Sequence, residues 1–290
     1  MVGLSGIADY ILSTDIQREE FRMNTAEELK IGFIGFGNMA GAIAEGLINS
    51  GFAAENCYAA AGHFDRLKEK CEKMGGINPV EDISDLIDAS DIIFIAVKPA
   101  KIKEVITPVR AQLSLSGKVI VSVVWGYNYD RYFDEEVLVK GTHVICSCPN
   151  TPVAINKGIF VVENKKSLSE EEFETVNELL GRISLVITVE TKLLGISGTV
   201  CGCGPAFTDM FIESLSDAAV MYGIPRKTAY QMVSRMIEGT SALQLHSGKH
   251  PGEMKDEVCS PGGSTIKGVA ALEEHGFRGA VIDAVKAIQG

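Results

Sequence analysis

Glycines that allow close approach to a phosphate stand near the start of the chain. Residues 30–41 read Lys-Ile-Gly-Phe-Ile-Gly-Phe-Gly-Asn-Met-Ala-Gly, a Gly-x-Gly-x-x-Ala pattern between a strand-like and a helix-like run. Gly35 allows a tight turn, Gly37 lets the backbone approach a pyrophosphate, and Ala40 keeps the helix close to the strand. Unpaired N–H groups at the helix start attract the anion. The alternative interpretation is a glycine turn that binds no ligand. The predicted dinucleotide-binding residues here are Gly35, Phe36, Gly37, Asn38, Met39 and Ala40.

Residues after two further strand-like runs extend this predicted cofactor site. The run 56–61 is not followed by the Asp or Glu that typically holds the ribose hydroxyls of NAD. His63 and Arg66 follow instead and could face a 2′-phosphate, which favours NADP while leaving NAD possible. A solvated His and Arg opening a surface helix explain the same residues equally well. The run 91–97 adds Val97, Lys98 and Pro99 at the edge where doubly wound sheets bind ligands, although Lys98 alone could be a solvated loop residue.

A second candidate for anion binding lies near the C-terminus. Residues 256–268 form a loop that leads into a helix-like pattern over 269–274. Glycines and hydroxyls at such a helix start place several N–H and O–H donors around one point, which suits a small carboxylate or phosphate. An ordinary N-cap with proline near the first turn explains the pattern equally well. The candidate residues are Ser260, Gly262, Gly263, Ser264 and Thr265.

Alternating strand-like and helix-like runs must position these residues. Short β-branched runs bounded by turn residues predict strands at 30–35, 56–61, 91–97, 118–124, 142–147, 158–162 and 185–189. Helix-like segments lie at 39–50, 65–74 and 170–183, and Ser169 with Glu172 forms a capping-box pattern before the last. This order predicts an α/β protein with a doubly wound, mostly parallel sheet, the Rossmann fold.

The pattern becomes helical after residue 189. Apolar residues at helical spacing run through 206–222 and 227–245, which predicts an all-α domain. We therefore divide the chain into an N-terminal extension (1–28), a dinucleotide-binding domain (29–189) and a helical domain (190–290). A broad stripe in the first helix must be buried, and an interface with a second copy would bury it. The stripe residues are Phe207, Met210, Phe211, Ser214, Leu215, Ala218 and Met221.

Five motifs in order resemble pyrroline-5-carboxylate reductase over residues 30–290. They are Ile34-Gly-Phe-Gly-Asn-Met-Ala40, Ala96-Val-Lys-Pro99, Pro149-Asn-Thr-Pro152, Gly202-Cys-Gly-Pro-Ala-Phe207, and Ser260-Pro-Gly-Gly-Ser-Thr265 with Leu272-Glu273. The resemblance implies a Rossmann domain followed by a helical dimerisation domain, in a homodimer or a higher oligomer of dimers. It also implies reduction of 1-pyrroline-5-carboxylate to L-proline by NAD(P)H, the last step of proline biosynthesis.

The resemblance places the substrate between the cofactor and the 260–265 loop. On that basis we expect the N–H groups of Gly262, Gly263 and Ser264 to hold the substrate carboxylate, and Thr265 Oγ to contact the ring nitrogen as the catalytic hydroxyl. Because the cofactor supplies the hydride, the protein needs only to place the reactants, and no metal is expected. The alternatives are a two-domain hydroxy-acid dehydrogenase and a non-catalytic NAD(P)-binding regulator derived from the reductase.

Cysteines replace residues typical of the resembled family. Cys146 and Cys148 stand in the usual Arg-x-Met positions, Cys201 and Cys203 replace serines, and Ser264 replaces a threonine. These changes bear on turnover rather than fold and motivate the regulator alternative. The resemblance brings both Cys-x-Cys pairs near the site. Three interpretations follow: a zinc site, a redox switch if Cys201 opens a helix that lowers its thiol pKa, and, as the leading one, small residues filling a tight turn.

Composition limits the other possible partners. The net charge of −11 opposes broad binding to nucleic acid or anionic lipid. No apolar run reaches the ~20 residues that span a bilayer, and the first 17 residues lack the basic start of a secretory or transit peptide. Seven cysteines, an odd number spread over a long chain, are typical of a reducing compartment. We therefore expect a cytoplasmic enzyme with a small-molecule substrate.

Overall fold

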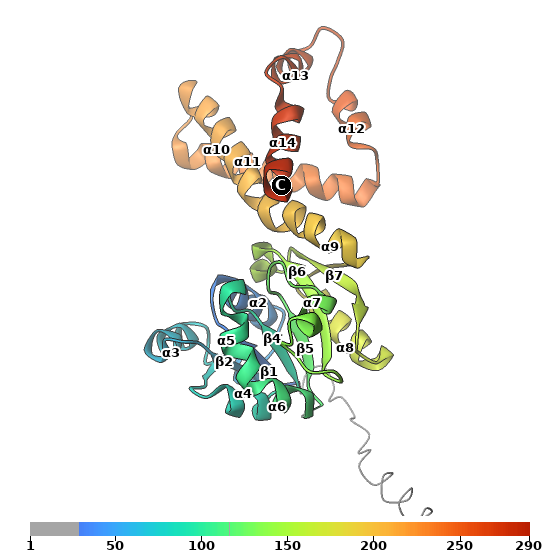
Figure 1. The fold of residues 1–290 in the computed structure, drawn as a ribbon. Coiled ribbons are helices and arrows are strands. Elements are labelled where there is room, and N and C mark those ends of the chain that lie inside the picture. Colours follow the sequence, from blue (N-terminus) through green and yellow to red (C-terminus); the bar gives the residue numbers. More distant parts are fainter. Residues whose placement is uncertain (1–28, 116) are drawn as a thin grey trace, which may run out of the picture. The chain divides into compact units, whose positions relative to one another are not determined.

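A computed structural model describes residues 29–115 and 117–290, so the predicted extension 1–28 lies outside the described residues (Figure 1). The chain divides into two compact units, the first ending at Gly198 and the second comprising Thr199–Gly290. None of the helices in the described ranges is long and apolar enough to cross a membrane.

The first unit contains an eight-stranded sheet in the order β3-β2-β1-β4-β5-β6-β7-β8. All neighbouring strands are parallel except β6 and β7, which are antiparallel. This order reverses direction between β1 and β4, as in a Rossmann fold, and confirms the predicted fold class. The strands are β1 Ile31–Ile34, β2 Cys57–Ala60, β3 Asn78–Pro79, β4 Ile92–Ile95, β5 Val119–Ser122, β6 His143–Pro149, β7 Gly158–Lys166 and β8 Ser184–Val189.

The central strands are almost entirely apolar because both faces of the sheet are covered. Every residue of β1, β4 and β5 is buried. Phe33 of β1 stacks on Phe94 of β4 with ring centroids 5.3 Å apart, and Phe36 meets Phe33 edge-on at 5.6 Å. The short β3 was not predicted, since a two-residue strand containing proline carries almost no periodic signal.

Helices on this unit cover the sheet and connect its strands (Figure 1). They are α2 Asn38–Asn49, α3 Phe64–Lys73, α4 Ile83–Ala89, α5 Ile102–Ile106, α6 Arg110–Leu115, α7 Tyr129–Asp134, α8 Glu170–Gly181 and α9 Thr191–Gly198. The predicted helices at 39–50, 65–74 and 170–183 correspond to α2, α3 and α8. The prediction began the helical domain at 190, whereas α9 packs against β6 and β7 and falls within the first compact unit.

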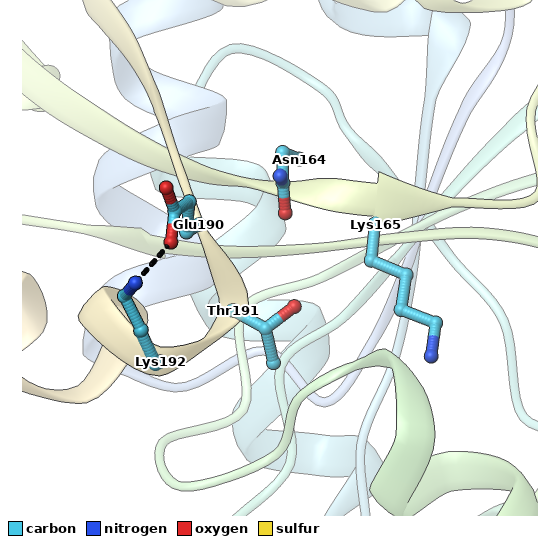
Figure 2. Close-up of a pocket in the computed structure, with 5 residues that line it drawn as sticks. All are labelled: Asn164, Lys165, Glu190, Thr191 and Lys192. Atoms are coloured by element: carbon cyan, nitrogen blue, oxygen red, sulfur yellow. Dashed lines mark ion pairs between the residues drawn. The ribbon is translucent and has the colours of Figure 1, made fainter.

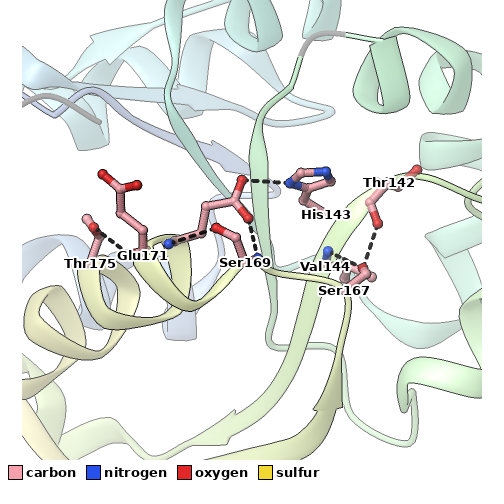
Figure 3. Close-up of polar contacts among 8 residues, drawn as sticks. Thr142, His143, Val144, Ser167, Ser169, Glu171 and Thr175 are labelled. Carbon is pink, nitrogen blue, oxygen red and sulfur yellow. Dashed lines mark hydrogen bonds and ion pairs between the residues drawn. The ribbon is translucent and has the colours of Figure 1, made fainter. Parts of the chain in front are cut away.

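The predicted capping box of α8 is present and carries an additional histidine contact (Figure 3). Ser169 Oγ accepts from the Glu172 N–H, and Glu172 Oε2 accepts from the Ser169 N–H at 2.7 Å. The second carboxylate oxygen of Glu172 lies 2.6 Å from Nδ1 of His143 at the start of β6. Nearby, Ser167 Oγ donates to the carbonyl of Thr142 at 2.7 Å. These contacts attach the start of α8 to an interior strand.

Every secondary-structure element of the second unit, residues 199–290, is a helix. Its helices are α10 Gly204–Met221, α11 Arg226–Ser247, α12 Pro251–Glu257, α13 Ser264–Glu274 and α14 Phe277–Gln289. Most of the predicted apolar stripe on α10 is solvent-accessible in the single chain: Met210 is 67% exposed and Met221 83%. Part of this stripe and residues of α14 line an apolar groove of about 480 Å³. A single copy of the chain therefore leaves a large apolar surface uncovered.

Candidate cofactor and substrate sites

The glycine-rich loop joins β1 to α2 at the carboxyl edge of the sheet. Gly35 has φ +89°, and a Cβ there would lie 2.9 Å from the carbonyl carbon and oxygen of Ala96, so only glycine fits. Gly37 is the N-cap of α2 with an extended backbone, and a Cβ there would meet nothing within 4 Å. Asn38, Met39 and Ala40 form the first turn of α2, where N–H groups lack intrahelical partners. The loop is therefore open at the point where a pyrophosphate would approach.

The ends of β2 and β4 flank this loop because both strands pair with β1. The Gly35 N–H donates to the Ala60 carbonyl at 2.9 Å, and the Ala96 N–H donates to the Ile34 carbonyl at 2.9 Å. Val97 follows directly, with its Cγ1 2.9 Å from the position of a Gly35 Cβ. The structure thus brings the candidate segments after β1, β2 and β4 together at one edge of the sheet.

The residues predicted to face the 2′-phosphate lie at the start of α3, and the predicted cofactor residues after β4 lie at the start of a short turn. His63 is the N-cap of α3 without a side-chain cap bond, Arg66 lies in its first turn, and both are exposed. Lys98 is the N-cap of the 3₁₀ turn Pro99–Lys101. Two basic side chains beside the end of β2, with no carboxylate directly after the strand, are compatible with a phosphorylated ribose.

The candidate substrate loop lies in the second unit and is shaped by a β-turn. The Gly263 N–H donates to the Ser260 carbonyl at 3.0 Å, with Pro261 and Gly262 at the centre of the turn. Gly262 has φ +72°, the conformation that a proline–glycine type II turn requires at its third position. A Cβ at Gly263 would lie 2.4 Å from Ser260 Oγ, so a larger residue would displace that hydroxyl.

Helix α13 begins at Ser264, five residues before the predicted helical pattern at 269. Gly263 is its N-cap and makes no side-chain cap bond, so the ordinary capping interpretation lacks its usual side-chain acceptor. Ser264 and Thr265 occupy the first turn, where they combine hydroxyls with unpaired N–H groups, and both are exposed. This arrangement can bind a small carboxylate.

Comparison with known proteins identifies the family. Residues 191–290 match the family described as pyrroline-5-carboxylate reductase dimerisation, and residues 30–126 match NADP oxidoreductase coenzyme F420-dependent. The chain is 40% identical to the pyrroline-5-carboxylate reductase of Treponema pallidum over 263 residues, covering 89% of this chain and 98% of that protein. The chain belongs to the pyrroline-5-carboxylate reductase family. The match to the dimerisation family covers the whole second unit and also α9.

Other relatives agree with this assignment. The Escherichia coli pyrroline-5-carboxylate reductase is 35% identical, with 89% of this chain and 95% of that protein covered. The crystal structure of the Plasmodium falciparum pyrroline carboxylate reductase with NADP bound has a TM-score of 0.81 at 29% identity, covering 90% of this chain and 96% of that one.

The cysteines that depart from the reductase pattern lie in two different settings. Cys146 is fully buried in β6, and burial, followed by the nearby Glu163 carboxylate, raises the pKa of its thiol well above the ordinary value. Cys148, two residues later, packs beside Gly198 and Trp125. Within the described ranges, no group of three or more His, Cys, Asp or Glu side chains is placed to hold a metal.

The structure contradicts the premise of the proposed Cys201 redox switch. Cys201 lies in a π-helical turn, Thr199–Cys203, which continues α9 directly into α10, so it does not open a helix. Burial raises the pKa of its thiol instead of lowering it. A neutral thiol is a weak nucleophile, so the predicted sensitivity to peroxide loses its physical basis. The tight turn expected around Cys203 is likewise part of this continuous helix.

Sequence reasoning missed a buried carboxylate in β7. Glu163 is fully buried, accepts from the Tyr129 N–H at 2.7 Å and accepts from Thr191 Oγ1 at 2.6 Å. Its position directly after the predicted β-branched run 158–162 gave no periodic signal. Next to it, Asn164, Lys165, Glu190, Thr191 and Lys192 line an open pocket of about 610 Å³ (Figure 2). Glu190 and Lys192 pair there at 2.6 Å, and none of the predicted site residues lines this pocket.

Proposed function

We propose that this protein reduces 1-pyrroline-5-carboxylate to L-proline with a hydride from NADPH. The observation that carries the proposal is the open glycine loop at the carboxyl edge of the sheet, in a chain that belongs to this reductase family. The same chain retains the Ser260–Thr265 turn at the start of α13. A dinucleotide site and a carboxylate site are the two binding functions that this reaction needs.

The loop residues fit a nicotinamide dinucleotide. We assign the pyrophosphate to the N–H groups at the start of α2, over the open side of Gly37. The exposed His63 and Arg66 favour NADP over NAD, and a relative whose crystal structure contains NADP supports this preference. The segment Val97–Pro99 would border the same ligand because it adjoins Gly35.

The chain's own residues supply placement rather than acid–base chemistry. The Gly263 N–H already donates to the Ser260 carbonyl within the turn. We therefore assign the substrate carboxylate to the N–H groups of Gly262 and Ser264, with Ser260 at the turn. Thr265 Oγ would contact the ring nitrogen, where a hydroxyl can donate or accept as the charge of the iminium is lost. When bound, NADPH supplies the hydride that forms the new C–H bond at the imine carbon, leaving NADP⁺ and the secondary amine of proline. Orientation by both sites accounts for the catalysis.

The assembly that we propose is a homodimer, or a higher oligomer of dimers, formed through the helical unit. The support is the match of residues 191–290 to a dimerisation family and the exposed apolar stripe on α10. A cytoplasmic location stays a prediction from the sequence.

Steady-state oxidation of NADPH with pyrroline-5-carboxylate tests the proposed function, with NADH measured in parallel. We expect turnover with both substrates present and a lower KM for NADPH than for NADH. Cofactor binding without detectable turnover would overturn the proposal and support the regulator alternative. Oxidation of NADPH with 2-oxo or 3-oxo acids, without activity on pyrroline-5-carboxylate, would support the dehydrogenase alternative.

A further inference from the structure

A lysine from α3 reaches the glycine-rich loop. Lys70 lies near the end of α3, and its Nζ donates to the Gly37 carbonyl at 2.7 Å and to the Phe36 carbonyl at 3.3 Å. The same ammonium stands 4.7 Å from the centre of the Phe36 ring, within the range of a cation–π contact. Three contacts therefore hold one side chain against two consecutive peptides of the loop.

The room for this lysine comes from Gly41, the glycine that ends the 30–41 stretch. A Cβ at Gly41 would lie 2.5 Å from Lys70 Nζ and 3.0 Å from Lys70 Cε. Partial burial lowers the pKa of Lys70 from its ordinary value, while electrostatic interactions with Cys71 and Glu45 act in the opposite direction. An ammonium that has lost part of its water is held in place by its hydrogen bonds, since leaving them unmade would be costly.

Peptide geometry links these contacts to the ligand side of the loop. In a planar trans peptide, the N–H of one residue points opposite to the preceding carbonyl. Because the Phe36 and Gly37 carbonyls face Lys70, the N–H groups of Gly37 and Asn38 face away from it, on the side opposite the α3 lysine. Those two N–H groups lie at the N-cap and first residue of α2, where an anion binds.

We propose that Lys70 is a positioning residue for the cofactor, holding the Phe36–Gly37–Asn38 peptides so that their N–H groups face the pyrophosphate. This inference rests on the proposed cofactor site and adds a residue to it. The pyrophosphate is common to NADP and NAD, so the effect of Lys70 is independent of the 2′-phosphate. His63 and Arg66, in contrast, would discriminate between the two cofactors.

Binding titrations with NADPH and NADH test the inference. Lys70→Met retains the length of the side chain and removes the ammonium. We expect it to raise the Kd for both cofactors by the same factor, about tenfold, which corresponds to the loss of hydrogen bonds from a charged donor. Lys73→Met, which removes an exposed lysine from the same helix, is the matched control and should leave both Kd values unchanged.

Gly41→Ala separates positioning from folding. Alanine favours a helix more than glycine does, which offsets part of the cost of the displaced Lys70 hydrogen bonds, so the protein should stay folded. Its methyl group would nevertheless displace the Lys70 ammonium, and we expect cofactor affinity to fall as in Lys70→Met. This variant also decides the matter if Lys70→Met does not fold.

Three outcomes would overturn the inference. They are unchanged affinity in a folded Lys70→Met, a loss confined to NADPH, and unchanged affinity in Gly41→Ala. Failure of the unmodified protein to bind either cofactor would instead refute the proposed function, and the inference with it.

Discussion

Replacing Gly37 by valine should remove cofactor binding and leave the protein folded. The backbone at Gly37, with φ −79° and ψ −153°, is extended and accessible to any residue. A Cβ there meets nothing within 4 Å, so valine creates no clash within the chain. Valine is a poorer N-cap than glycine by about 1 kcal/mol, and this is offset by about 0.4–1 kcal/mol from the smaller entropy of the unfolded chain. The net change in unfolding free energy should lie within about 1 kcal/mol.

The effect on binding should be much larger. The valine methyl groups would occupy the space through which the loop approaches the pyrophosphate. Losing two hydrogen bonds to a charged ligand, at about 1.5–3 kcal/mol each, raises the Kd for NADPH at least about a hundredfold. Gly37→Val should therefore weaken NADPH binding strongly while it changes the unfolding free energy little.

Gly35→Ala, two residues earlier, is the matched control, because we expect it to lower the unfolding free energy whereas Gly37→Val should change it little. Its positive φ costs a non-glycine residue about 1–2 kcal/mol. Its Cβ would press on the Ala96 backbone at 2.9 Å, and such overpacking costs about 1–3 kcal/mol more. We expect Gly35→Ala to lose about 2–5 kcal/mol of unfolding free energy.

Urea denaturation measures the unfolding free energy of both variants, and NADPH fluorescence titration measures their affinity. If Gly37→Val binds NADPH as tightly as the unmodified protein, the loop does not hold the pyrophosphate. If Gly37→Val is destabilised as strongly as Gly35→Ala, the argument from open space around Gly37 is wrong.

Four further outcomes are expected. Thr265→Ala should lower turnover about tenfold, because it removes one hydrogen bond, and should change NADPH affinity little. An unchanged rate would exclude a role for the hydroxyl. Sedimentation should show a dimer at micromolar concentration, and a stable monomer would contradict an obligate dimer. Glu163→Leu should lower the urea midpoint, because the Thr191 hydroxyl and the partly buried Tyr129 N–H lose their acceptor, at about 1–3 kcal/mol each. Glu163→Gln keeps an acceptor oxygen and should cost less. Hydrogen bonds from Arg131, then Lys103 and Tyr127, lower the pKa of Glu135 to about 2. The ionised carboxylate therefore stabilises the fold above the ordinary carboxyl pKa, and this stabilisation is lost as the pH falls toward 2. The difference in unfolding free energy between Glu135→Gln and the unmodified protein should therefore shrink between about pH 7 and pH 3.

Local patterns were enough to predict much of the first unit. The Gly35–Ala40 loop, the capping box at Ser169 and the buried strands each depend on residues within a few positions of one another. Turn conformation, capping and burial periodicity are encoded at that range, so these elements agree with the structure. The start of α13 is a partial exception, because glycine and hydroxyl residues before 269 resemble a loop as readily as a first helical turn.

Contacts between distant segments decided the rest. Packing of α9 on β6 and β7 moves the end of the first compact unit to Gly198. The uninterrupted helix through Thr199–Cys203 removes the condition on which the Cys201 redox switch depended, a helix that starts at Cys201. The sequence by itself determined the glycine turn and the helix start at which we propose that a phosphate binds, because both features are local. Only the tertiary structure placed Lys70 against that turn, 33 residues away, and buried Glu163 beneath Thr191, because side-chain hydrogen bonds across such separations depend on how helices and strands pack.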